Sequence, residues 1–169
     1  KGQGLGSRMM LSIMEFARSK GLAQIEGLVL ANNDNMLRLM RSLEKPIVCA
    51  VNGVAAGAGA NIAFACDIVL AARSAKVIQA VAKIGLVPDT GGTWFLPQRV
   101  GMARAMGLAL LADKLPAEKA AEWGLIWAAV EDAEFVASVD RLATQLSSAP
   151  TKALVRTRQA LHAAPGHTL

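Results

Sequence analysis

The 169-residue sequence predicts a single α/β domain organised around a parallel β-sheet. Two apolar runs, residues 47–51 and 68–72, lack polar alternation, which is typical of strands buried on both faces of a parallel sheet. The residues between them, 53–65, are nearly all small, which would let a helix approach the sheet closely. A turn at Asn52-Gly53 follows the first run, and a second turn at residues 88–92 opens another helix.

The N-terminal part of the chain has a weaker pattern. Residues 9–16 predict a helix that Gly21 ends, and residues 25–31 predict a short strand. Residues 36–43 have the apolar spacing of an amphipathic helix. Pro46 prevents this helix from continuing into the first buried strand.

After the second buried strand, residues 77–81 are expected to continue the sheet. A helix capped by Asp89 or Thr90 is expected to run through residues 94–99 and to end at Gly101. The remaining expected elements are a helix at residues 103–111, a helix with Pro116 in its first turn that Gly124 ends, a strand at residues 125–130, and helices at residues 133–146 and 151–163.

The composition excludes several classes of protein. An apolar fraction of 53% argues against a disordered chain. The net charge of +5 is spread along the sequence, which argues against nucleic acid as a partner and leaves a weak preference for anionic ligands such as phosphorylated carriers. Cys49 and Cys66 lie in apolar surroundings and are expected to be small buried side chains, because their spacing fits no zinc or CxxC motif.

One stretch has the length of a membrane span. Residues 46–66 carry no charge, but Pro46, Asn52-Gly53 and Asn61 interrupt them, and a turn in lipid would leave backbone groups unpaired. We therefore expect a buried core segment and no membrane partner. The first ten residues lack the pattern of a signal peptide, so a cytoplasmic location is expected.

The glycine pattern Gly53-x3-Gly57-x-Gly59 has three interpretations. Its spacing is that of a dehydrogenase dinucleotide loop, although the chain has no Tyr and Arg73 stands where an acidic ribose partner is expected. It also suits a helix packed tightly on a sheet. The third interpretation is a backbone poor in side chains that offers N–H donors to a developing oxyanion.

Asp89 is the strongest candidate for a catalytic side chain. It precedes Gly91-Gly92 at a helix start, among apolar neighbours, and the alternative is an ordinary helix cap. An apolar pocket favours a protonated carboxyl and would raise the pKa of Asp89, whereas a helix N-terminus favours the charged form and would lower it. The sequence leaves open which of the two effects is larger. Asn61 is either a polar group in a pocket or a buried amide with satisfied hydrogen bonds.

Three segments carry a resemblance to a known family: NGVAAGAGANIAFACDIVLAARSAK, KIGLVPDTGGTWFLPQRVGMARAMGLALL and PAEKAAEWGLIW. They resemble the crotonase (enoyl-CoA hydratase/isomerase) superfamily over about residues 35–161, most strongly the isomerases of phenylacetate degradation. The resemblance implies a crotonase-like spiral of ββα units whose N-terminal part is incomplete or altered. Residues 1–34 remain an unrecognised segment, and residues 35–169 are expected to form the core without the family's final helices.

The resemblance also implies a mechanism. Family enzymes hold a thioester carbonyl between two backbone N–H groups and stabilise an enolate, and the second donor falls on Ala58. The two glutamates of the hydratases fall on Asn61 and Val81, which disfavours addition of water, whereas the aspartate of the isomerases falls on Asp89. The implied activity is isomerisation of an acyl-CoA with one carboxylate as acid and base. The implied substrate-binding residues are Gly57, Gly59, Asn61, Val81 and Gly91.

Substrate and assembly follow from the same resemblance. The substrate is expected to be 1,2-epoxyphenylacetyl-CoA, whose ring becomes an oxepin, or an enoyl-CoA whose double bond migrates, so phenylacetate or fatty acid metabolism is implied. No cofactor or metal is expected, because coenzyme A is part of the substrate, and the assembly is expected to be a homotrimer or a dimer of trimers. Two alternatives remain: a truncated non-catalytic subunit and, with less support, an NAD(P)-dependent reductase.

Overall fold

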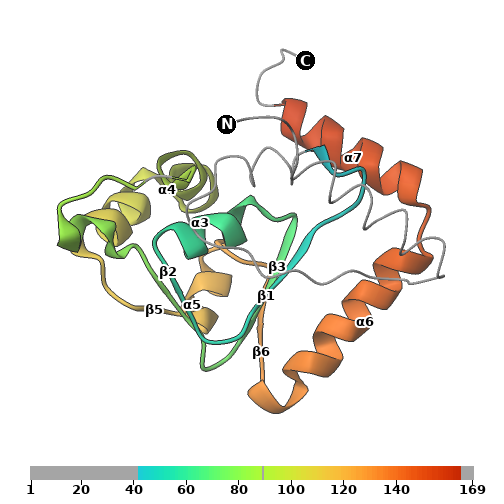
Figure 1. Ribbon diagram of the computed structural model, residues 1–169, viewed down its shortest axis with the longest axis horizontal. Helices are drawn as coiled ribbons and strands as arrows, with labels where there is room; N and C mark the ends of the chain where they lie inside the picture. The colour runs from blue at the N-terminus through green and yellow to red at the C-terminus, as the bar shows by residue number, and fades with distance from the viewer. Residues whose placement is uncertain (1–41, 89, 165–169) are drawn as a thin grey trace, which may run out of the picture.

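A computed structural model describes residues 42–88 and 90–164, arranged as two small β-sheets surrounded by helices (Figure 1). The elements expected at residues 9–16 and 25–31, and all but the end of the helix expected at residues 36–43, lie outside this part of the chain.

The first sheet is parallel, as the apolar runs predict. It contains β1 (Val48–Val51), β3 (Ile68–Ala72) and β6 (Ala128–Val130), in the order β1-β3-β6. Cys49 pairs with Val69. The central strand β3 is the most buried of the three, so the continuous apolar run of this strand matches its environment.

The second sheet corrects two expectations. It contains β2 (Val54–Ala56), β4 (Lys76–Ile78) and β5 (Leu115–Pro116), with β4 parallel to β2 and antiparallel to β5. Residues 77–81 therefore do not continue the first sheet, because the chain turns after β3 and enters the second sheet instead. Val81 lies in the 3-10 helix η1 (Ala80–Ile84).

The chain repeats one local plan. Strand β1 leads through a turn into β2 and then into helix α3 (Ala58–Ala65); β3 leads through a turn into β4 and then into η1. In both repeats the first strand belongs to the first sheet and the second strand to the second sheet. This ββα plan is the unit that the resemblance implies.

Helix α4 (Gly92–Leu111) is interrupted by a kink. Gly101 has φ 76° and ψ 162°, which is not helical, so the expected end of a helix at Gly101 is present as a kink. Gly91 is the N-cap residue of α4, so neither Asp89 nor Thr90 occupies that position.

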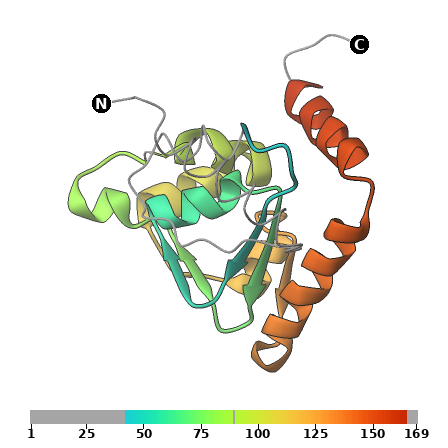
Figure 2. The same ribbon diagram turned by 45° about the vertical axis from the view of Figure 1, so that its right-hand side comes forward.

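Three further helices complete the fold. Pro116 is the N-cap residue of α5 (Ala117–Glu122) and lies one position before the first turn where it was expected. The short helix η2 (Asp132–Glu134) leads into α6 (Phe135–Ser148), and α7 (Thr151–Ala163) has the expected bounds. Figures 1 and 2 both show α6 and α7 along one flank of the molecule, apart from α4. Within residues 42–88 and 90–164, no helix has both the length and the apolar character needed to cross a bilayer.

One partly buried cation connects several of these elements. The Arg99 guanidinium, on α4, donates hydrogen bonds to the carbonyl oxygens of Phe64, Cys66 (3.2 Å) and Leu125 (3.2 Å). Phe64 and Cys66 lie at the C-terminal end of α3, where the carbonyls lack helical partners and the helix dipole favours a positive charge. Burial lowers the pKa of Arg99. Arg99 thus fixes α4 to the end of α3 and to the segment before β6.

Replacing this cation should destabilise the fold strongly. In Arg99→Met, three carbonyl oxygens lose a charged donor, so the free energy of unfolding should fall by roughly 3 kcal/mol, as measured by urea denaturation. Arg104→Met is the matched control on the same helix, because Arg104 is exposed and lies over the Trp123 ring at 4.9 Å. The free energy of unfolding of Arg104→Met should fall by less than about 1 kcal/mol. Equal losses in the two variants would contradict the role given to Arg99.

Candidate active site

The N-terminus of α3 presents a backbone donor that no described residue accepts. Gly57 has φ 52° and ψ −120°, and its N–H donates to the Ile78 carbonyl of β4 at 2.8 Å. Ala58 follows as the first residue of α3, where no carbonyl of the helix can accept its N–H. None of the residues that the structure describes accepts a hydrogen bond from the Ala58 N–H. Within the described residues, this amide is thus a candidate donor to a bound acceptor.

Val81 lies directly beside this donor. A Cβ added to Gly57 would lie 3.4 Å from Cγ1 of Val81, so the Val81 side chain contacts the turn that precedes Ala58. A Cβ added to Gly59, in the first turn of α3, would meet no atom of the described residues within 4 Å. The expected site residues Gly57, Ala58 and Val81 therefore come together, and the backbone next to them is open at Gly59.

The dinucleotide-loop interpretation of the glycine pattern is wrong. In a Rossmann loop the glycines connect a strand directly to a helix. Here the residues between Gly53 and Gly57 form strand β2, which pairs with β4, and the turn into α3 begins only at Gly57. The pattern thus spans an additional strand, which removes the geometric basis for the reductase alternative.

Asn61 belongs to a buried amide pair. Asn61 and Gln79 are both 0% exposed, and Gln79 Nε2 donates to Asn61 Oδ1 at 3.0 Å. The second amide oxygen, Gln79 Oε1, is buried without a hydrogen-bond partner in the described part of the chain. Gln79 was absent from the residues singled out in the sequence. The signal that marks it is a polar side chain between the apolar neighbours Ile78 and Ala80.

The turn that follows Asp89 is tightly constrained. Thr90 is buried and has φ 49°, a conformation that is rare for a β-branched residue, and Gly91 has φ 79°. A Cβ at Gly91 would lie 2.6 Å from Cε2 of Phe95, and one at Gly92 would lie 2.5 Å from Nδ2 of Asn61. Both glycines are required because side chains pack against their backbone. Asp89 itself lies outside the described residues.

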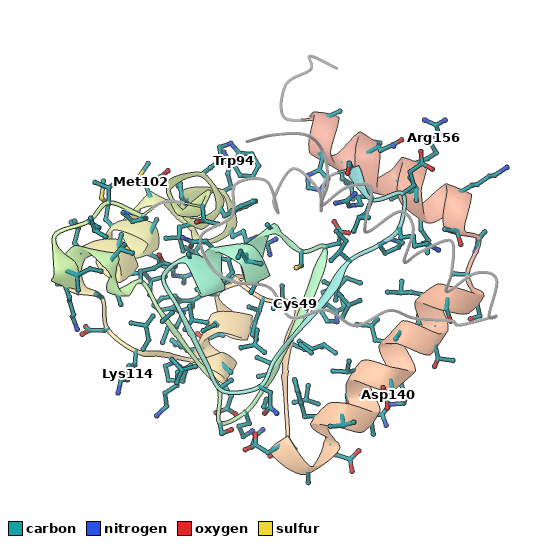
Figure 3. All side chains as sticks on the ribbon, viewed as in Figure 1. Cys49, Trp94, Met102, Lys114, Asp140 and Arg156 are labelled. Carbon is teal, nitrogen blue, oxygen red and sulfur yellow. The ribbon has the colours of Figure 1, made fainter. Side chains whose placement is uncertain are left out.

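An exposed apolar group of side chains lies close to this turn in sequence. Phe95, expected among the apolar neighbours of Asp89, is buried, whereas the other four are exposed. Figure 3 shows the Trp94 side chain projecting outward from α4. Large apolar side chains gathered at a surface are typical of a binding site. The exposed members are Ile84 (70%), Leu86 (59%), Val87 (76%) and Trp94 (51%).

The two cysteines form a separate pair in the interior. The Cys66 thiol donates to the Ile62 carbonyl at 3.4 Å, and the neighbouring Cys66 lowers the pKa of Cys49. The neighbouring Cys49 and burial both raise the pKa of the Cys66 thiol. Cys66 is thus an inert buried side chain, as expected. Among the described residues, no three His, Cys, Asp or Glu side chains lie close enough to hold a metal ion.

Comparison with known proteins identifies the family. Residues 15–169 match the family model described as enoyl-CoA hydratase/isomerase. The chain belongs to this family. It is 52% identical over 134 residues to the 1,2-epoxyphenylacetyl-CoA isomerase of Escherichia coli K12, covering 79% of this chain and 51% of the relative. It is also 52% identical over 128 residues to a probable enoyl-CoA hydratase of Rhodobacter capsulatus, covering 76% of this chain and 50% of the relative.

A solved structure confirms the crotonase fold. The structure of an enoyl-CoA hydratase from Mycobacterium avium subsp. paratuberculosis K-10 superimposes with a TM-score of 0.76 at 43% identity, covering 78% of this chain and 53% of that one. The resemblance seen in the sequence is therefore correct. The chain spans about half the length of the curated relatives described above. It is a member of the crotonase superfamily, related to both isomerases and hydratases.

The contact between the Gly92 backbone and Asn61 can be tested through stability. Gly92→Ala places a methyl group against a buried amide that Gln79 holds in place, so the free energy of unfolding should fall by about 1–3 kcal/mol. Gly107→Ala is the matched control on α4, because a Cβ there meets nothing within 4 Å. The free energy of unfolding of Gly107→Ala should rise by about 0.5–1 kcal/mol, because alanine has a higher helix propensity than glycine. Stabilisation of both variants in urea denaturation would show that the contact is absent.

Proposed function

We propose that this chain isomerises an acyl-CoA thioester through an enolate, with Asp89 as the single acid and base. The observation that carries the proposal is the Ala58 N–H, which no described residue accepts, beside two side chains that cannot transfer protons. Val81 is apolar and contacts the turn before Ala58, and Asn61 is an amide paired with Gln79. Addition of water through two carboxylates has no support at these positions, whereas isomerisation needs only one carboxylate.

Each part has a defined role in this reaction. The thioester carbonyl oxygen accepts a hydrogen bond from the Ala58 N–H, which stabilises the negative charge that develops on that oxygen. The Asp89 carboxylate removes a proton from the acyl carbon chain, and an enolate forms. The same carboxyl returns the proton at another carbon, so the product has the formula of the substrate and no water is consumed.

The acyl group is proposed to be 1,2-epoxyphenylacetyl-CoA, with migration of an enoyl-CoA double bond as the second substrate class. The sequence identity of 52% over 134 residues to a 1,2-epoxyphenylacetyl-CoA isomerase supports the first choice. The exposed Leu86, Val87 and Trp94 support an apolar acyl group near Asp89, because their burial against it is favourable. The proposed steps use only the Ala58 N–H and the Asp89 carboxyl, so they include no cofactor.

Replacing the proposed acid and base should abolish turnover. Asp89→Asn keeps the shape of the side chain but cannot accept the proton, so kcat should fall about 100- to 10,000-fold while KM changes little. The assay uses 1,2-epoxyphenylacetyl-CoA and a 3-enoyl-CoA as separate substrates. Asp113→Asn, at an exposed position after α4, is the control and should keep wild-type turnover. Full activity of Asp89→Asn would contradict the proposal.

The oxyanion donor can be removed without changing a side-chain function. Ala58→Pro deletes the N–H at the first position of α3, where proline is well tolerated, so kcat should fall about 100- to 1,000-fold with little change in melting temperature. Should this variant unfold, a backbone ester at position 58 removes the same donor. Unchanged kcat in either folded protein would exclude Ala58 as the donor. A folded wild-type chain that binds a non-hydrolysable acyl-CoA without turnover would favour the non-catalytic subunit.

We further propose that the chain assembles as a homotrimer or a dimer of trimers. Support comes from the second half of α4, whose exposed apolar side chains would be covered in an assembly. Light scattering after size-exclusion chromatography should give three or six times the mass of one chain, and a monomer at micromolar concentration would contradict the proposal. The side chains concerned are Met102 (61%), Met106 (52%), Leu110 (69%) and Leu111 (64%).

A further inference from the structure

A cavity lies between the start of α4 and the last two turns of α7. Its volume is about 380 Å³, with Trp94 on one side and Arg158, Gln159, His162 and Ala163 on the other, which is the size of a site for a small ligand. We propose that this cavity binds a small aromatic carboxylate, with the ring of the ligand against Trp94 and its carboxylate against α7. The proposal goes beyond the isomerase function and does not depend on it.

The α7 side of the cavity is rich in hydrogen-bond donors. Arg158, Gln159 and His162 share one face of the helix, because residues three or four positions apart are neighbours on a helix surface. The described residues that line the cavity include no acidic side chain. Helix α7 as a whole carries Lys152, Arg156 and Arg158 and no Asp or Glu. This side of the cavity therefore favours a negatively charged ligand.

Two of these side chains are held by residues that do not line the cavity. The Arg158 side chain is 10% exposed; its Nε donates to Asp67 Oδ1 at 2.7 Å and its Nη1 donates to the Leu43 carbonyl at 3.2 Å. Gln159 Oε1 accepts from Arg156 Nη1 at 3.2 Å, so the NH2 end of the amide is directed away from Arg156. Because Asp67 already compensates the charge of Arg158, the Gln159 NH2 group is the donor on which binding of a carboxylate depends most.

Trp94 supplies an aromatic surface on the opposite side. Its ring meets the Phe95 ring edge to face, with the centroids 5.1 Å apart and the planes at 89°. Phe95 is buried, so this contact fixes the orientation of the Trp94 ring, while Trp94 remains 51% exposed. A planar ring can stack on the exposed part of Trp94. An aromatic carboxylate therefore suits both sides of the cavity, whereas an inorganic anion would use only the α7 side.

Binding of phenylacetate to the 169-residue chain tests the proposal by isothermal titration calorimetry. We expect a Kd of about 1 mM or lower. Phenylacetamide has the same shape without the charge, and acetate has the charge without the ring, so each should bind at least about tenfold more weakly than phenylacetate. A larger Kd for phenylacetate, or a smaller preference over either compound, would overturn the proposal.

One variant removes the donor on α7. Gln159→Glu replaces the NH2 group by a carboxylate of the same size, so the Kd for phenylacetate should rise at least about tenfold. Gln145→Glu, on α6, is the matched control: the position is also exposed, does not line the cavity and undergoes the same change of charge. This control should keep the wild-type Kd. An equal rise of Kd in the two variants would overturn the assigned binding position.

A second variant removes the aromatic surface. Trp94→Leu keeps an apolar side chain, and the Kd for phenylacetate should rise about three- to tenfold while that for acetate stays unchanged. Trp127→Leu is the control, because Trp127 is 74% exposed and does not line the cavity. An unchanged Kd in Trp94→Leu would contradict stacking on this ring. Ala58→Pro should bind phenylacetate as the wild type does, so failure of the proposed isomerase function would leave this binding in place.

Discussion

The partly buried Arg99 guanidinium is the interaction on which the arrangement of α3 and α4 depends. It holds α4 to the C-terminal carbonyls of α3, while the Asn61 side chain, in the middle of α3, contacts α4 again at Gly92. Two contacts at different points along a short helix constrain both the distance and the angle between the helices. Ala58 and Gly92 begin these two helices, so the relative placement of the Ala58 amide and the start of α4 is set by the same pair of contacts.

The sequence predicts those elements whose side chains follow one regular pattern over several residues. The two parallel strands and helix α7 were recognised because long apolar runs and clear boundaries mark them. Strand β2 was missed because its three residues stand between glycines, and a segment so short gives no period. The membership of β4 in a second sheet was also missed, since a buried strand has the same pattern in either sheet.

The candidate site was predictable in a different way. Gly57, Ala58, Asn61 and Val81 came from the family resemblance, and the structure places Val81 beside Gly57 and sets Asn61 against Gly92. The role of Asp89 stays a prediction, because that residue lies outside the described structure. Gln79 was missed because a single polar residue between short apolar segments does not reveal whether it is buried, and its partner lies 18 residues away in sequence.

The kink at Gly101 divides α4 into two parts, each with a buried and an exposed side. Phe95 is buried and Trp94 exposed before the kink, and Leu108 is buried and Met102 exposed after it. The backbone at Gly101 has a conformation that is essentially restricted to glycine, so another residue at this position would destabilise the kink. Substitutions at the exposed positions of either part can therefore change the surface of α4, whereas position 101 is restricted by its own backbone conformation.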